Sequence, residues 1–253
     1  MVAGGGIRKG VSLGSERTIE IEHLGRMGYA RAFEVQRERH ESVLAQRGEG
    51  DGVGGGGGGG GIGRLLLVEH DPVITVSRRA RSGEHLLAGP ELLAQHGVQV
   101  EQTDRGGDIT YHGPGQIVGY PIIDLNALGL RLHEYMRQLE ETVIRTIGTY
   151  SVTGVRDPGA TGVWVPGESG EPERKIAAFG VRVRKWTTMH GLALNVTTDL
   201  SHFGLIVPCG LPGRPVTSLE VETDGAVTSM DEVTGRLVGS FCEVFGVQPS
   251  ESS

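Results

Sequence analysis

Cys209 and Lys175 are the two side chains of this 253-residue chain best suited to covalent chemistry. Cys209 lies between Pro208, which stiffens the approach, and Gly210, which lets backbone N–H groups come close to a bound carbonyl. A free thiol with a pKa of about 8.5 is mostly protonated at neutral pH, so it needs a cationic neighbour or a base to attack well. Lys175 is the candidate for that neighbour, and we predict that the two act as nucleophile and base.

The residues that follow Lys175 predict a strand over 175–185. The period of two then places the lysine on an apolar face and Arg182 and Arg184 on the opposite face; the apolar face comprises Lys175, Ala177, Phe179, Val181 and Val183. A lysine on a buried face can exchange protons near neutral pH, which a surface lysine rarely does. The alternative is that Lys175 only opens the strand and its ammonium group reaches water.

The second cysteine, Cys242, lies in a pattern typical of a helix. Ser229 and Glu232 form a predicted capping box, and apolar residues follow at helical spacing. We therefore expect Cys242 to be a small core residue.

Composition and charge restrict the classes of function. The formal net charge of −7 lacks the basic excess of a nucleic-acid binder. The two cysteines form no C-x-x-C pair, so neither a disulfide framework nor a zinc site is indicated, and a reducing cytoplasm fits best. No long apolar stretch or secretory signal is evident, so we expect a cytoplasmic protein with no membrane and no nucleic-acid partner.

The chain has 43 glycines, and many of them lie in a low-complexity run at 48–63. We predict that this run is a flexible insertion in a single catalytic domain, 1–253, whose core covers about 20–245. Because the glycines follow a predicted helix and precede a strand, they do not have the order of a phosphate-binding loop.

Apolar periodicity predicts helices and strands in groups. Helices are expected at 26–47, 90–97, 131–148 and 229–246, and strands at 65–69, 73–77, 105–125 in two pieces, 161–165, 175–184 and 190–196. Grouped strands favour an α/β (α+β) fold with a mixed sheet packed with helices over a doubly wound parallel sheet.

Two further segments could form the wall of a pocket. In RGGDITYH, 105–112, two glycines let the backbone approach a ligand, although a glycine-eased turn into a strand explains them equally well. In HGLALNV, 190–196, small residues share one strand face and leave space there. His112 either orients a substrate or caps the following turn, and His70 and His190 are better explained as satisfied polar residues near the core.

With these residues in place, the chain resembles the octanoyltransferase family of lipoate biosynthesis over roughly 20–225. The shared motifs are EHDPVIT at 69–75, RGGDITYHGPGQIVGYP at 105–121, GVWV at 162–165, KIAAFGVRV at 175–183, HGLALNV at 190–196, and PCGL followed by VTSLE at 208–220.

The resemblance implies a fold like that of lipoate and biotin protein ligases, with Cys209 as the acyl-thioester nucleophile and Lys175 as its acid/base partner. It also implies an acyl-chain site lined by Arg105, Gly106, Gly107, Asp108, Ile109, Thr110, Tyr111, His112, Ala178, Phe179, Gly180, Gly191, Leu192 and Ala193. The implied reaction moves an octanoyl or lipoyl group from acyl carrier protein to a lysine of a lipoyl domain. The implied acceptors are 2-oxoacid dehydrogenase subunits and the glycine-cleavage H protein, and no cofactor or metal is expected.

Three other functions are alternatives to octanoyl transfer. An ATP-dependent lipoate–protein ligase of similar fold would need no catalytic cysteine, and a non-catalytic lipoyl-domain binder would need neither Cys209 nor Lys175. A cysteine hydrolase would pair its thiol with a histidine. The pairing of Cys209 with Lys175 argues against all three.

Overall fold

The computed structural model describes residues 17–48, 61–167, 170–210, 213–227 and 229–251. Of the insertion predicted at 48–63, residues 49–60 lie outside these ranges, whereas Gly48 ends a helix and residues 61–63 begin a strand. An eight-stranded sheet has the order β11-β1-β2-β6-β10-β9-β8-β7 and a three-stranded sheet the order β4-β3-β5. Strands of the large sheet are β1 (Thr18–Met27), β2 (Gly61–His70), β6 (Gln116–Ile123), β7 (Val155–Asp157), β8 (Ala160–Val165), β9 (Arg174–Arg184), β10 (Thr187–Asn195) and β11 (Gln248–Glu251). The small sheet contains β3 (Val73–Ser77), β4 (Gln99–Thr103) and β5 (Ile109–His112).

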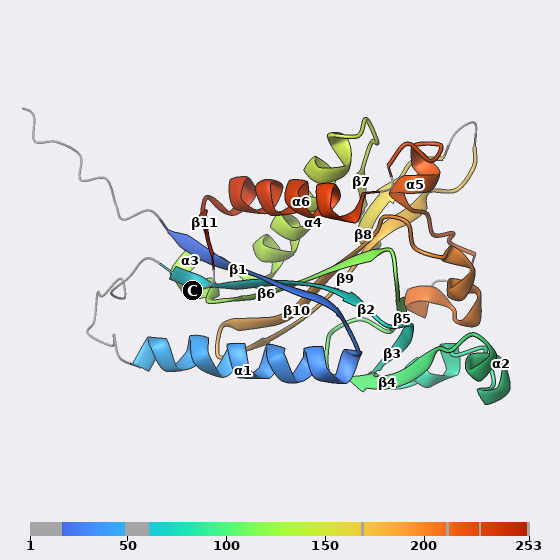
Figure 1. Ribbon diagram of the computed structural model, residues 1–253, viewed down its shortest axis with the longest axis horizontal. Coiled ribbons are helices and arrows are strands. Elements are labelled where there is room, and N and C mark those ends of the chain that lie inside the picture. The colour runs from blue at the N-terminus through green and yellow to red at the C-terminus, as the bar shows by residue number, and fades with distance from the viewer. Residues whose placement is uncertain (1–16, 49–60, 168–169, 211–212, 228, 252–253) are drawn as a thin grey trace, which may run out of the picture.

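Helices cover both faces of the large sheet (Figure 1). The α-helices are α1 (Tyr29–Gly48), α2 (Pro90–Gln95), α3 (Leu125–Leu128), α4 (Leu132–Gly148), α5 (Leu219–Glu222) and α6 (Met230–Phe245). Short 3₁₀ turns are η1 (Ser82–His85), η2 (Leu200–Leu205) and η3 (Pro208–Gly210). In Figure 1, α1 runs along one face while α4 and α6 lie on the other.

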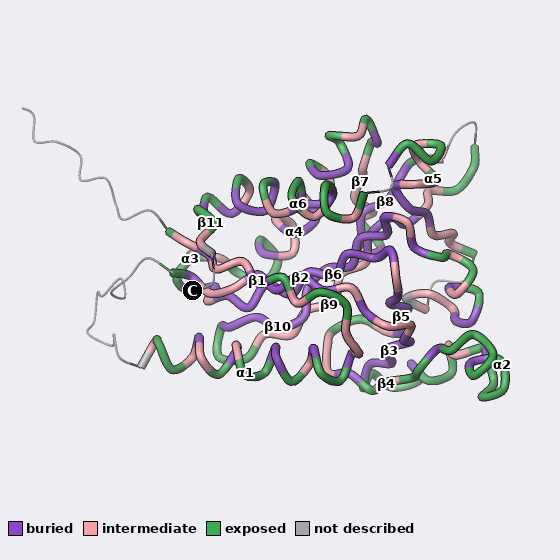
Figure 2. The backbone as a smooth tube through the Cα atoms, in the orientation of Figure 1, coloured by how far each residue is buried: buried purple, intermediate pink, exposed green. Residues whose placement is uncertain are grey.

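The large sheet is mixed, as the grouped strands predicted. β1 pairs in parallel with β2 and β11, whereas the remaining neighbours are antiparallel. Figure 2 shows that the buried backbone follows the central strands and the inner sides of the helices. The predicted α/β fold with a mixed sheet is therefore confirmed. No helix in the described ranges combines the length and the apolar character needed to cross a bilayer.

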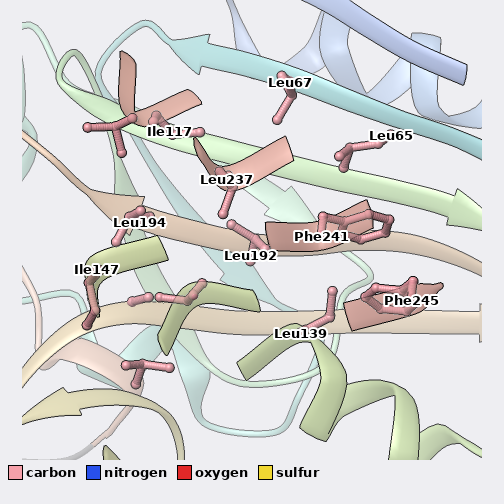
Figure 3. Packing of buried hydrophobic residues seen from close by; sticks show 14 of the residues in the cluster. Leu65, Leu67, Ile117, Leu139, Ile147, Leu192, Leu194, Leu237, Phe241 and Phe245 are labelled. Atoms are coloured by element: carbon pink, nitrogen blue, oxygen red, sulfur yellow. The ribbon is translucent and has the colours of Figure 1, made fainter. Parts of the chain in front are cut away.

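The main core lies between the large sheet and the pair α4 and α6. Leu139 of α4 and Phe241 of α6 are at most 1% exposed and pack with Leu65 and Leu192 of the sheet (Figure 3). Cys242 is buried in the same core, and burial raises the pKa of its thiol. The prediction that Cys242 is a small core residue is confirmed, and such a thiol is poorly suited to attack.

Two details of the first and fourth helices differ from the sequence prediction. The helix expected at 26–47 begins at Tyr29, because residues 18–27 form β1, a strand that the periodicity did not predict. The apolar spacing of the helix predicted at 131–148 places Leu132 on its buried face, yet Leu132 is 46% exposed at the first position of α4.

Candidate active site

A cavity of about 270 Å³ lies where the two sheets meet, between β5, β6, β9 and β10. Its lining combines side chains from both sheets with Tyr29 from the first turn of α1. The residues predicted from the sequence that line it are Arg105, Gly107, Asp108, Ile109, Thr110, His112, Lys175, Ala178, Phe179, Gly180, Gly191, Leu192 and Ala193. Motifs separated by up to about ninety residues along the chain are thus brought to one cavity.

Lys175 is 6% exposed near the start of β9 and lines this cavity. Its Nζ donates a hydrogen bond to the Thr161 carbonyl oxygen, 3.2 Å away, and lies 4.5 Å from the centroid of the Trp164 ring. The indole stays in place because its N–H donates to the Ala160 carbonyl oxygen. The ring quadrupole and the carbonyl both stabilise a cation, so the lysine is held at the cavity wall instead of reaching water.

The strict alternation predicted for β9 is wrong at its beginning. Val163 pairs with Ala177 and Trp164 with Lys175, so one extra residue, Ile176, is inserted in β9. Such a bulge reverses the side-chain phase. Lys175 therefore lines the cavity, while Ala177 packs into the main core on the other side of the sheet.

The chain that carries Cys209 returns to the backbone of Lys175. Lys175 N–H donates to the Pro215 carbonyl oxygen, and Thr217 N–H donates to the Lys175 carbonyl oxygen, both at 2.9 Å. Cys209 itself is the central residue of η3, and its side chain lies outside the described part of the chain. The contact between Cys209 and Lys175 therefore stays a prediction, although the segments that carry them are joined.

Gly106 and Tyr111 are the two predicted substrate-binding residues that do not line the cavity. Tyr111 is 1% exposed and packs against Phe203 in a separate cluster around the small sheet. Thr110 and His112 alternate with Tyr111 along β5 and line the cavity, and Ile109 at the start of the strand lines it as well although it packs in the same cluster as Tyr111. Placing all of 105–112 in the acyl site is not supported by this geometry.

Gly191, one of the small residues predicted to leave space on its strand face, lines the cavity and also lets two strand backbones come close together. A Cβ on Gly191 would lie 2.3 Å from the Gly119 carbonyl oxygen of the neighbouring strand. Gly106, which lies outside the cavity, donates its N–H to the Val181 carbonyl oxygen and so anchors the 105–108 loop on β9. Close packing of the Gly191 backbone against Gly119 therefore helps to determine the shape of the wall.

A chain of buried amides fixes the proton on His112. Gln116 donates through Nε2 to the Tyr111 carbonyl oxygen and to Asn195 Oδ1, so its own Oε1 faces His112 Nδ1 at 2.7 Å. Asn195 in turn donates to the Thr217 carbonyl oxygen. An amide oxygen only accepts, so His112 carries its proton on Nδ1 and leaves Nε2 as an acceptor. His112 lines the cavity and also bonds across the 113–115 turn to Gln116, so its role in orienting a substrate stays a prediction.

The other histidines of the region are also held neutral. His70 donates from Nδ1 to the Met27 carbonyl oxygen and accepts from the Tyr120 hydroxyl, 2.7 Å away. Burial lowers the pKa of His70 to about 4 and that of His112 to about 3. His190 pairs with Asp104 at 2.9 Å, and burial lowers its pKa as well. The prediction of satisfied polar residues holds for His70, whereas His190 also lines the cavity.

Several lining residues were not predicted from the sequence. They are Tyr29, Arg79, Val118, Tyr120, Gly159, Ala160 and Thr161. Tyr120 belongs to the glycine-rich motif at 105–121 and could have been predicted as a cavity residue for that reason. Tyr29 instead follows the apolar periodicity of a helix, which indicates an ordinary core position. Only the packing of α1 against β6 and β10 brings it to the cavity. No group of three or more potential metal ligands occurs among the described residues.

Comparisons with known proteins agree with this geometry. The lipoyl protein ligase A/B catalytic domain matches residues 29–242. The chain is 46% identical to an octanoyltransferase of Chloroflexus aggregans, over 92% of this chain and 97% of that protein. It is 45% identical to an octanoyltransferase of Acidobacterium capsulatum, over 91% of both chains.

Solved structures show the same fold at low sequence identity. A bipartite lipoate protein ligase from Thermoplasma acidophilum superposes with a TM-score of 0.67 at 18% identity, covering 93% of this chain and 87% of that one. A lipoate-protein ligase A bound with ATP gives 0.66 at 16% identity, covering 93% and 88%. By its family match and its close relatives, the chain belongs to the octanoyltransferases of the lipoyl protein ligase A/B catalytic domain family.

Proposed function

We propose that this acyltransferase moves an octanoyl or lipoyl group from acyl carrier protein to the lysine of a lipoyl domain through a thioester on Cys209. The octanoyltransferase relatives support octanoyl transfer in protein lipoylation. The donor, the thioester and the roles of Cys209 and Lys175 are the proposed parts. The single observation that carries them is the backbone pairing of Lys175 with 215–217, which ties the Cys209 loop to the cavity wall.

The first half-reaction follows from the chemistry of the two side chains. The Cys209 thiolate attacks the donor thioester, the carbon–sulfur bond to the carrier breaks, and Lys175 gives its proton to the departing thiolate. One thioester replaces another, so the acyl-enzyme forms at little net free-energy cost. Lys175 is left neutral.

The second half-reaction uses that neutral amine. The acceptor lysine arrives as an ammonium ion, and Lys175 takes one of its protons, which frees a lone pair to attack the acyl-enzyme. Expulsion of the Cys209 thiolate and loss of a second proton from the attacking nitrogen then yield the amide and restore the ion pair. Proposed acceptors are lipoyl domains of 2-oxoacid dehydrogenase subunits and the glycine-cleavage H protein.

The cavity suits an acyl chain that ends in a carbonyl group. Leu192, Ala193 and Val118 supply apolar surface, and the histidines beside them are neutral at physiological pH because burial lowers their pKa values. These apolar side chains and neutral rings give a hydrocarbon chain a surface to bind, beside the charged lining residues Arg79, Arg105, Asp108 and Lys175.

An ATP-dependent ligase is the alternative with the same fold. The structural likeness to the ATP-bound ligase supports the fold alone, because the identity is 16%. A ligase activates a free acid, whereas a transferase needs an acyl thioester and no nucleotide. The requirement for ATP therefore separates the two.

Intact-protein mass spectrometry after mixing with octanoyl carrier protein tests the proposal. We expect a hydroxylamine-labile octanoyl adduct on Cys209 without ATP, and no adduct in Cys209→Ser. Cys242→Ser is the matched control and should retain the adduct, because Cys242 is buried in the core. An adduct on Cys242, or transfer that requires ATP and free octanoate, would refute the mechanism.

A further inference from the structure

Asp108 is the one acidic residue among the described residues that line the cavity. It directly precedes β5, and its carbonyl oxygen accepts a hydrogen bond from Ser77 N–H. Its side chain is 12% exposed, and the buried Oδ1 has no hydrogen-bond partner among the described residues. A buried carboxylate oxygen without a partner costs free energy that an arriving cation would offset.

His85 stands behind this carboxylate. Its Nδ1 lies 2.9 Å from Asp108 Oδ2, and its side chain is 32% exposed. His85 does not line the cavity, so it contacts the carboxylate from outside the cavity. His85 Nδ1 makes no hydrogen bond with a described residue in this arrangement, so a protonated ring contacts Oδ2 through its charge and leaves Oδ1 for a group within the cavity.

The pair lies against the turn that carries Cys209. A Cβ added to Gly210, the next residue, would be 2.7 Å from Asp108 Oδ2 and 2.8 Å from His85 Cε1. Val207 N–H donates to the His85 carbonyl oxygen at 2.8 Å, which joins the two loops on the other side. Asp108 is therefore next to the nucleophile turn and on the wall of the cavity that holds Lys175.

A role for Asp108 follows from the proton balance of the second half-reaction, and it rests on the proposed function. An acceptor ammonium carries three N–H protons and the amide product carries one, so two protons must leave. Neutral Lys175 can take only one of them, because it then becomes an ammonium ion itself. When Cys209 departs as a thiolate and Lys175 stays protonated, the second proton needs another acceptor near the attacking nitrogen.

We propose that Asp108 binds the ammonium of the acceptor lysine beside the acyl-enzyme and accepts its second proton, with His85 as the residue that positions the carboxylate. The new carbon–nitrogen bond forms as the carbon–sulfur bond to Cys209 breaks. One proton moves to Lys175 and one to Asp108, which releases it to solvent after the product leaves. Asp108 thereby favours a cationic amine over neutral nucleophiles.

The test compares two nucleophiles on preloaded octanoyl-enzyme. A lipoyl domain presents a cationic lysine, whereas hydroxylamine is largely uncharged at neutral pH. In Asp108→Asn, which keeps the size and removes the charge, the ratio of the lysine rate to the hydroxylamine rate should fall at least about tenfold. His85→Gln should lower the same ratio by a smaller factor, because the carboxylate remains. Asp231→Asn, an exposed site on α6, serves as the charge control and should leave the ratio unchanged.

Equal losses with both nucleophiles would show that Asp108 only supports the nucleophile turn, and an unchanged ratio in a folded Asp108→Asn protein would overturn the inference. Should that variant fail to fold, the ratio in His85→Gln decides the question in the same way. Failure of the wild-type enzyme to form any acyl-enzyme would instead refute the proposed function, so the two outcomes are distinguishable.

Discussion

Gly180 of β9 lies directly against Gly106 of the 105–108 loop: a Cβ on Gly180 would come 2.7 Å from the Gly106 carbonyl oxygen. Two residues 74 positions apart thus set how closely the loop approaches the strand that carries Lys175. This contact explains why position 180 requires glycine, although its φ angle is not in the positive range that favours glycine.

Gly180→Ala should displace the 105–108 loop and reduce octanoyl transfer by about tenfold or more, because small misplacements at a catalytic wall are costly. The measurement is steady-state turnover together with thermal unfolding. Gly239→Ala is the matched control, since a Cβ there meets nothing within 4 Å in the middle of α6, and it should be neutral or slightly stabilising. Unaltered turnover in Gly180→Ala would show that the loop tolerates the shift.

Lys175→Arg should separate the two half-reactions. Arginine keeps a positive charge beside the thiolate but cannot act as a base, since its pKa stays above about 12. Acyl-enzyme formation should survive in part while transfer to the lipoyl domain fails, and in Lys175→Ala both steps should slow. Single-turnover mass spectrometry measures each step. Wild-type transfer by Lys175→Arg would contradict the proton-transfer role.

Ala178→Leu should shorten the acyl chain that the enzyme accepts. Ala178 pairs with Ala193 across β9 and β10, and both line the cavity, so added carbon atoms there fill space that the chain needs. We expect the ratio of kcat/KM for octanoyl over butanoyl donors to fall by about tenfold or more. Equal losses for both donors would indicate a general distortion of the site.

Acidification should destabilise the fold through its buried histidines. Burial lowers the pKa of His70 to about 4 and that of His112 to about 3 from an unfolded value of about 6.5. The unfolded state therefore binds more protons below about pH 6.5, and stability falls as the pH falls towards the folded pKa values. Each histidine contributes about 2 kcal/mol of this loss between about pH 6.5 and pH 4.5.

Urea unfolding of His70→Gln at several pH values measures this effect. The variant should be less stable near neutral pH, because it loses the contact with Tyr120, yet its stability should depend less on pH than that of the wild type. His133→Gln, at an exposed position on α4, should keep the wild-type slope. Parallel slopes for His70→Gln and wild type would show that other groups govern acid unfolding.

Local patterns in the sequence determined the long elements and the motifs. The apolar stripes of α4 and α6 predict those helices because their spacing matches one face of a helix, and the placement of Cys242 in the core follows from the same spacing. The grouped strands likewise indicate a mixed sheet. The motifs around Cys209 and Lys175 could be recognised from residue types and order alone.

Tertiary structure alone decided which residues meet. The bulge at Ile176 reverses the phase of Lys175, and its cause is the pairing of β9 with β8, which no local pattern contains. The short strands β4, β7 and β11 form because neighbours complete their hydrogen bonds, so their own sequences carry little signal. The contact of Asp108 with His85 joins two loops 23 residues apart, and only the folded chain reveals it.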